Sequence, residues 1–229
     1  MKTKIIATIG PASSSYHTLK RMAANGMSIA RINTKYGSIR YYLKIVDMLR
    51  KIGKCRILFD IKGLKMINWL KMQDFDYLAV SFADTTSQIK RIRKLFSPKK
   101  IKIISKIETK KGIININRLI EESDGIMVAR GDLGDNISFE RVPIAQKLII
   151  KNCNKNRKMV ITATEMLLSM TDSKTPERAE ASDIANAVLD GSDALMLSEE
   201  TAIGKYPALA VKTMNIIIRE TEKKKNLLK

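Results

Sequence analysis

The stretch that decides the fold runs from Ser105 to Gly134 and reads SKIETKKGIININRLIEESDGIMVARGDLG. An apolar β-type run at residues 101–104 leads into Lys106 and Glu108, and a second run at 125–129 leads into Asp132. Buried parallel strands in barrel enzymes bring their carboxyl-terminal ends to one surface. A lysine beside two carboxylates there suits a divalent metal held by the acids, with an ammonium that stabilises developing negative charge.

A simpler interpretation of the same residues is an ordinary α/β protein whose strands end in salt-bridged charges, because charged residues are common where loops begin. Either cluster alone fits that interpretation. Two clusters on successive strands favour a functional site, since catalytic groups in (β/α)8 barrels come from the ends of several strands.

Strand and helix signals alternate along the whole chain, as βαβ units require. The predicted strands cover residues 4–9, 27–32, 56–59, 77–80, 101–107, 125–129, 159–163 and 194–197. The first predicted helix can be capped by the serines at residues 13–15 and runs to the stop pair Asn25-Gly26. The other predicted helices cover residues 39–52, 85–95, 115–122, 140–156, 176–189 and 207–222. Eight strands with intervening helices predict a (β/α)8 TIM barrel over residues 1–222, followed by a basic C-terminal tail at 223–229.

The third crossover departs from this regular alternation because it is short. Only residues 61–76 separate the third strand from the fourth, and a parallel connection usually needs a dozen or more residues with a helix. Trp69 can form one cramped helical turn there. We therefore expect a barrel that is slightly truncated at this crossover.

Composition excludes several classes of site and partner. The chain of 229 residues carries a formal net charge of +19, but its lysines are spread throughout and no aromatic stacking pattern accompanies them, so a nucleic-acid partner is not expected. One histidine, His17, excludes His-rich metal sites. Cys55 and Cys153 have neither disulfide nor zinc spacing.

The sequence also bears on location and assembly. No apolar segment is long enough to span a bilayer, and the amino-terminal residues lack the pattern of a signal peptide. We therefore expect a cytoplasmic protein with no membrane partner. A homo-oligomer is compatible with the sequence.

Polar residues end almost every predicted strand, and in a barrel they would converge on one mouth. They are Arg31, Asn33, Asp60, Ser81, Lys106, Glu108, Asp132, Thr164, Ser198 and Glu200.

Several of these residues belong to longer motifs: TKIIATIGPASSS, GMSIARIN, SKIE, SDGIMVARGDLG, VITATEML and PERAEASDIANAVLDGSDALMLSEETAIGKYP. With these motifs the sequence resembles the catalytic barrel domain of pyruvate kinase. The resemblance implies transfer of a phosphoryl group from phosphoenolpyruvate to ADP, which gives pyruvate and ATP.

The resemblance also implies roles for individual residues. Lys106, Thr164 and Arg31 would be catalytic, and Lys106 would stabilise the transferring phosphoryl group and the enolate oxygen. Glu108 and Asp132 would hold Mg²⁺ or Mn²⁺. Substrate would bind to four residues, namely Arg31, Gly131, Asp132 and Thr164.

The departures from the family pattern concern the lid, the nucleotide and the monovalent cation. The lid domain that the family inserts after the third strand is reduced to a stub, no stretch of these residues matches its C-terminal domain, and Ile67 stands at the position of a nucleotide-facing arginine. Asn33 and Asp60 match two ligands of the family's potassium site. Because Lys65 and Lys35 add positive charge there, the resemblance predicts that K⁺ is not required and that one of these lysines substitutes for it.

Three functions therefore stay open at the level of sequence. The first is an active pyruvate kinase, which the complete set of Lys106, Glu108, Asp132 and Thr164 favours. The second is a degenerate barrel restricted to metal-dependent enolpyruvate or oxaloacetate chemistry, which the missing lid favours. The third is a non-catalytic binding remnant.

Overall fold

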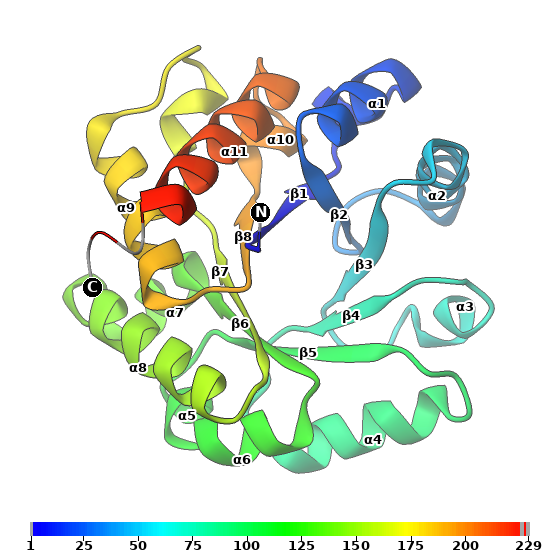
Figure 1. Ribbon diagram of the computed structural model, residues 1–229. Coiled ribbons are helices and arrows are strands. Elements are labelled where there is room, and N and C mark those ends of the chain that lie inside the picture. The colour runs from blue at the N-terminus through cyan, green and yellow to red at the C-terminus, as the bar shows by residue number, and fades with distance from the viewer. Residues whose placement is uncertain (1, 225–226, 228–229) are drawn as a thin grey trace.

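Eight parallel strands pair in chain order, and the last pairs with the first, so the sheet closes into a barrel (Figure 1). The computed structural model describes residues 2–224 and residue 227. This architecture confirms the predicted (β/α)8 barrel. The strands are β1 (Lys4–Thr8), β2 (Met27–Asn33), β3 (Arg56–Ile61), β4 (Tyr77–Val80), β5 (Lys102–Ile107), β6 (Gly125–Ala129), β7 (Met159–Ala163) and β8 (Ala194–Leu197).

Helices form an outer ring around the strands (Figure 1). The main ones are α1 (Tyr16–Ala24), α2 (Ile39–Ile52), α3 (Ile67–Lys71), α4 (Thr86–Phe96), α6 (Ile116–Glu122), α8 (Val142–Lys155), α9 (Arg178–Asp190) and α11 (Pro207–Lys224). Short helices that the sequence analysis missed follow three strands: α5 (Lys110–Ile114), α7 (Arg130–Ile137) and α10 (Glu199–Ala202). Three 3-10 turns complete the set: η1 (Pro11–Ser13), η2 (Phe139–Arg141) and η3 (Leu168–Thr171).

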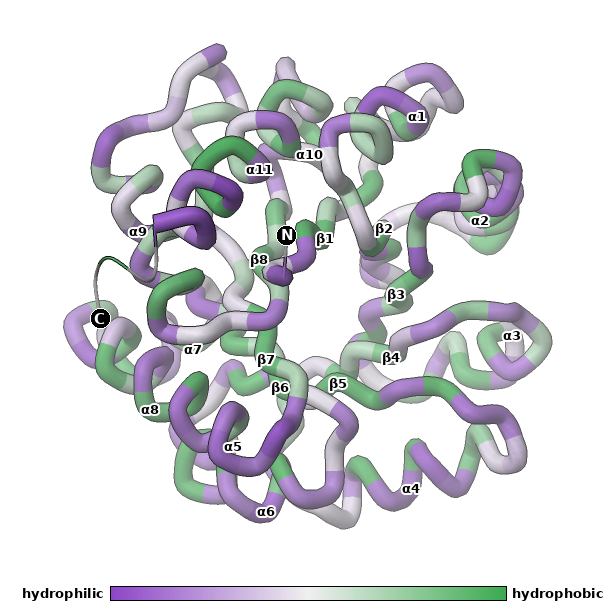
Figure 2. Tube along the Cα trace, in the orientation of Figure 1, coloured by the Kyte–Doolittle hydropathy of each residue, from purple (hydrophilic) through white to green (hydrophobic). Residues whose placement is uncertain are grey.

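The strands are buried on both faces, which explains their nearly continuous apolar sequences. Successive side chains alternate between the barrel interior and the layer under the helices. Ile5 belongs to the outer layer and Ile6 to the inner one, and Leu58 and Met127 also fill the interior. Figure 2 shows the complementary pattern in α4, where hydrophobic and hydrophilic segments alternate along the helix.

Aspartates fix the start of alternate strands. One aspartate directly precedes each of β4, β6 and β8, and its carboxylate accepts a hydrogen bond of 2.8 to 2.9 Å from a backbone N–H at the start of the preceding strand. These pairs are Asp76 with Ile57, Asp124 with Ile103 and Asp193 with Val160. The bonds set the stagger between neighbouring strands at the end of the barrel opposite the charged strand ends.

The short third crossover is closed by aromatic packing. Helix α3 has only five residues, yet β3 and β4 still pair in parallel. The Trp69 ring lies 5.6 Å from Phe59 and 5.8 Å from Tyr42, centroid to centroid. Trp69 therefore packs into the space over the crossover, which confirms the expected truncated connection.

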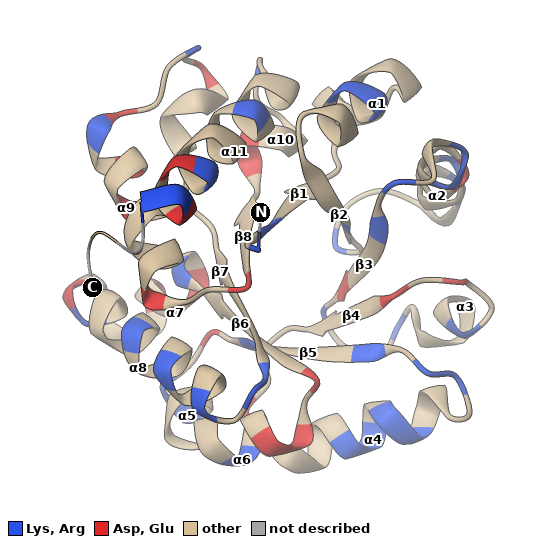
Figure 3. Ribbon diagram, in the orientation of Figure 1, with Lys and Arg blue, Asp and Glu red and all other residues tan. Residues whose placement is uncertain are grey.

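Two further expectations concern the chain's surface and end. None of the helices formed by residues 2–224 is long and apolar enough to cross a membrane. Helix α11 continues two residues past the predicted end, and the rest of the predicted basic tail lies largely outside the described residues. Lysines and arginines are scattered over helices on all sides of the barrel, as Figure 3 shows.

Candidate active site

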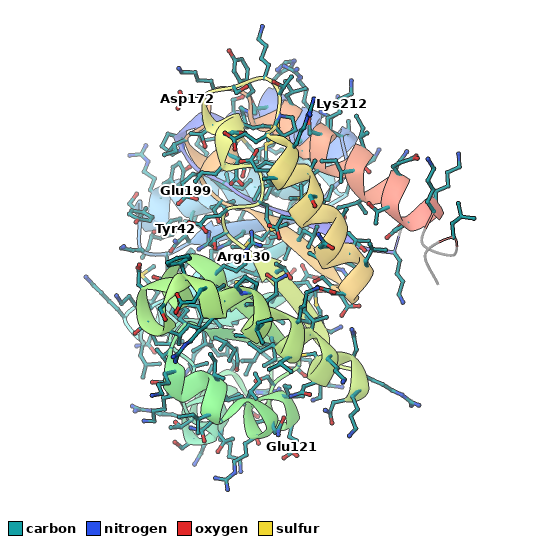
Figure 4. All side chains as sticks on the ribbon, turned by 90° about the vertical axis from the view of Figure 1, so that its left-hand side faces the viewer. Tyr42, Glu121, Arg130, Asp172, Glu199 and Lys212 are labelled. Carbon is teal, nitrogen blue, oxygen red and sulfur yellow. The ribbon has the colours of Figure 1, made fainter. Side chains whose placement is uncertain are left out.

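The carboxyl-terminal ends of the strands surround a cleft of about 720 Å³. Below the cleft, the interior of the barrel is filled with apolar side chains. At the cleft itself, several strands end in an inward-facing residue that is polar or charged. The cleft is lined by four cationic and four anionic side chains, so its formal charge is zero: Arg31, Lys35, Lys62, Lys106, Asp60, Glu108, Asp132 and Glu199. Figure 4 shows Glu199 and Tyr42, another lining residue, toward the same end of the barrel.

Arg31 and Asp60 form the inner part of this site. Arg31 Nε and Nη2 lie 2.9 and 2.8 Å from Asp60 Oδ2, and Arg31 Nη1 donates a 2.9 Å hydrogen bond to Thr8 Oγ1. Burial alone would raise the pKa of Asp60, but the charges of Arg31 and Lys106 outweigh it and hold that pKa below its ordinary value. Asp60 is therefore a fixed anion at neutral pH.

Lys106 lies at the centre of the charged cluster. Its Nζ is 3.1 Å from Asp60 Oδ2, 2.8 Å from Glu108 Oε1 and 3.1 Å from Ser81 Oγ. Its side chain is only 8% exposed. An ammonium held on three sides by oxygen atoms has little freedom, so its position relative to the cleft is fixed before any ligand arrives.

Glu108 connects this cluster to the rim of the cleft. Its Oε2 accepts a 2.5 Å hydrogen bond from the backbone N–H of Phe82, a residue held at a positive φ of 52°. Burial raises the pKa of Glu108 above its ordinary value, the Lys106 charge opposes the rise, and the negative charge of Asp132 adds to it. The two carboxylates predicted to share a metal line the same cleft.

Asp132 and Thr164 lie on the opposite wall from β3. Asp132 is exposed in the first turn of α7, and the neighbouring N–H of Gly131 donates a 2.9 Å hydrogen bond to Thr164 Oγ1. Thr164 and Glu165 both have positive φ values, 72° and 52°. For a β-branched residue this backbone is costly and persists only where the surroundings enforce it.

Arg130 enforces that strained turn, a role that the sequence analysis did not assign. Its guanidinium donates to the carbonyl of Thr164 at 2.6 and 3.1 Å, to the carbonyl of Glu165 at 2.8 Å, and pairs with Asp183 at 2.5 Å. The only sequence signal was its position directly after a predicted strand.

Glu200 is another buried acid, but it is not among the residues that line the cleft. Its carboxylate accepts backbone hydrogen bonds from Leu167 at 2.9 Å and Ser198 at 2.6 Å. Burial raises its pKa, and these hydrogen bonds oppose the rise. It therefore ties the turn after β7 to the end of β8, whereas Ser198 itself lines the cleft.

The donor set fits a hard divalent cation. Glu108 and Asp132 both line the cleft and offer carboxylate oxygens, the ligands that Mg²⁺ and Mn²⁺ prefer. Among the described residues no group of three His, Cys, Asp or Glu side chains could hold a metal ion. Two acids leave the other coordination positions of the ion free for water and phosphate oxygens. Such a site suits an ion that binds together with a phosphate group.

The structure separates the residues predicted around the monovalent cation. Asn33 and Lys35 line the cleft, and Asn33 Oδ1 accepts a 3.0 Å hydrogen bond from the Lys35 N–H. Lys65 is exposed on the turn before α3, outside the residues that line the cleft. Ile67 is buried in the hydrophobic core, so its side chain does not stand at the cleft at all.

Comparison with known proteins shows the family of the chain. Residues 1–71 and 62–211 match the family described as pyruvate kinase, barrel domain. The chain belongs to the pyruvate kinase family. It is 31% identical to pyruvate kinase from Thermococcus litoralis over 96% of this chain and 70% of the relative. It is 33% identical to pyruvate kinase from Thermoplasma acidophilum over 98% of this chain and 59% of the relative.

Similarity is highest over part of the barrel. Pyruvate kinase from Geobacillus stearothermophilus is 53% identical over 66% of this chain but only 26% of its own length. The alignment with the Thermococcus pyruvate kinase runs over 331 positions against 229 residues here, so that relative carries inserted residues. The two matched segments overlap at residues 62–71, at the shortened third crossover.

Proposed function

We propose that this chain is an active pyruvate kinase that transfers the phosphoryl group of phosphoenolpyruvate to ADP. The observation that carries the proposal is the Lys106 ammonium, fixed between Asp60 and Glu108 in a cleft that also contains Asp132 and Thr164. Positioning and charge neutralisation are the main protein contributions to phosphoryl transfer. A fixed ammonium beside paired acids supplies both.

In the proposed reaction a β-phosphate oxygen of ADP forms a bond to phosphorus as the phosphorus bond to the enol oxygen breaks. The electron pair of the broken bond stays on that oxygen, and the resulting enolate takes a proton at carbon to give pyruvate. Lys106 would stabilise the negative charge on the departing oxygen, and Arg31 would bind the phosphoryl group. Thr164 and the Gly131 backbone would orient the carboxylate end of the substrate.

Glu108 and Asp132 would hold Mg²⁺ or Mn²⁺ in this site. The bound ion would supply positive charge to the phosphate and enolate oxygens. The cleft is otherwise neutral by formal charge, so a divalent ion gives it the net positive charge that two anionic substrates require.

The nucleotide would bind along the less polar side of the cleft. Tyr36, Tyr41, Pro11 and Ile203 line that side, and Tyr36 is 63% exposed. Aromatic rings offer a flat surface on which a purine can stack. We further propose that K⁺ is dispensable, because Arg31 and Lys106 already pair with Asp60 and Lys35 adds another cation to the cleft.

A second candidate is metal-dependent enolpyruvate or oxaloacetate chemistry without efficient transfer to ADP. The exposed position of Asp132 favours it, because an open site screens electrostatic catalysis with water. A non-catalytic binding role is the remaining alternative. We also propose a cytoplasmic location and a homo-oligomer.

The deciding experiment is a coupled assay of the purified chain with phosphoenolpyruvate, ADP and Mg²⁺. Pyruvate and ATP should form in equal amounts. Pyruvate without ATP would support the second candidate, and the absence of both products would support the binding role.

A further inference from the structure

The charges that line the cleft divide into an inner set with partners and an outer set at the rim. Arg31 and Lys106 are buried and paired with Asp60 and Glu108. On the rim, Lys35 lies 5.1 Å from the centroid of the Tyr36 ring, and that neighbour's hydrogen bond raises the pKa of Lys35. The last cation that lines the cleft, Lys62, makes no ion pair with any residue in the described part of the chain.

Strand geometry explains why Lys62 points toward the cleft. Side chains alternate along β3, so Leu58 and Asp60 face the barrel interior and Ile61 faces the outer core. Lys62 follows the strand directly and continues the inward series. Its ammonium lies 5.0 Å from the centroid of the Phe82 ring, a distance typical of a cation–π contact.

This position places Lys62 one step outward from the catalytic cluster. Phe82 donates its backbone N–H to Glu108, and Glu108 pairs with Lys106. In the proposed reaction the β-phosphate of ADP approaches the phosphoryl group held by Arg31, so the diphosphate would extend along this side of the rim. An exposed ammonium with three donors and no acid partner is suited to unbridged phosphate oxygens.

We infer that Lys62 binds the diphosphate of the incoming nucleotide and selects phosphorylated over unphosphorylated nucleosides. The inference rests on the proposed function, because it assigns a substrate contact within the same cleft. Ile67 is buried in the core and cannot contact the nucleotide. Lys62 is the cationic residue of this crossover that lines the cleft.

The test is calorimetric titration of ADP and of adenosine, each with Mg²⁺, into the parent chain, Lys62→Ala and Lys62→Arg. Lys62→Ala should weaken ADP binding about tenfold and leave adenosine binding unchanged, because one charge-assisted contact is lost. Lys62→Arg should retain most of the ADP affinity. The matched control is Lys71→Ala, which removes an exposed lysine of the same crossover that does not line the cleft.

Titration with Mn²⁺ checks that the site itself is intact, and Lys62→Ala should bind Mn²⁺ like the parent. ADP affinity within twofold of the parent in Lys62→Ala would overturn the inference. An equal loss in Lys71→Ala, or no ADP binding by the parent, would overturn it as well. Lys62-dependent ADP binding without any turnover would instead refute the proposed phosphoryl transfer and leave this inference standing.

Discussion

Replacing Lys106 with methionine separates its contribution to chemistry from its contribution to folding. In the variant Asp60 keeps Arg31 as a partner, whereas Glu108 loses the ion pair with Lys106 and retains the hydrogen bond from the Phe82 N–H. If the charge aimed at the developing enolate is essential, turnover should fall by about 10² to 10³. The coupled assay at neutral pH measures that loss.

The stability cost of the same substitution has an upper bound. A buried glutamate left without its lysine can take up a proton instead of remaining charged. From an ordinary pKa of about 4.3, neutralising it at pH 7 costs at most about 3.7 kcal/mol, and at pH 5 about 1 kcal/mol. For a chain of this size these values correspond to losses in Tm of about 7 to 15 °C and about 2 to 4 °C.

The sign of this pH dependence follows from the direction of the pKa. Burial already raises the pKa of Glu108, and removal of Lys106 raises it further. The folded state then binds more protons than the unfolded state between the two pKa values, so stability falls as pH rises through that window. The deficit of Lys106→Met should therefore shrink as the solution is acidified toward pH 5.

Thermal unfolding followed by circular dichroism, at pH 5 and pH 7 in the presence of a chelator, measures both deficits. The control is Lys102→Met, the same substitution at the exposed opposite end of β5, which should change the free energy of unfolding by no more than about 0.5 kcal/mol. Unchanged turnover in Lys106→Met would refute the catalytic role. An equal deficit at both pH values would refute the protonation argument.

Further outcomes follow from the same site. Asp132→Ala should weaken Mn²⁺ binding at least tenfold, while Asp135→Ala on the same helix should not; equal affinities would make Asp132 structural. Arg130→Gln should lower turnover and reduce stability by about 1 to 3 kcal/mol, because the turn at Thr164 loses its support; a parent-like melting curve would contradict this. Turnover should persist in buffer free of Na⁺ and K⁺ at constant ionic strength, and Lys35→Gln should introduce a K⁺ requirement; strong K⁺ activation of the parent would oppose the prediction.

The barrel could be predicted from sequence because its strands are short apolar runs with clear stops. Each of the eight predicted strands overlaps an observed one, and β4, β6, β7 and β8 have the predicted bounds. Helix α7 was missed because its sequence contains two glycines and has little apolar periodicity. The helix forms there because the chain must turn sharply after β6 while Leu133 is buried.

The convergence of the charged residues was equally predictable, but their pairing was not. Strand ends indicated that Arg31, Asp60, Lys106 and Glu108 would share one mouth, as they do. Asp60 pairs with both Arg31 and Lys106 because of the stagger between β2, β3 and β5. The sequence contains no local signal for that stagger, which is set by long-range pairing and by the aspartates at the opposite end of the barrel.

The two lysines after β3 show how far the alternation of a strand predicts the direction of a side chain. A strand fixes side-chain direction by alternation, and this order extends as far as Lys62, which lines the cleft two residues after Asp60. Gly63 then adopts a positive φ of 78°, and the alternation ends. Lys65 is carried onto the exposed turn before α3. Two lysines only three residues apart thus differ in their access to the cleft, and the backbone at Gly63 is the physical reason.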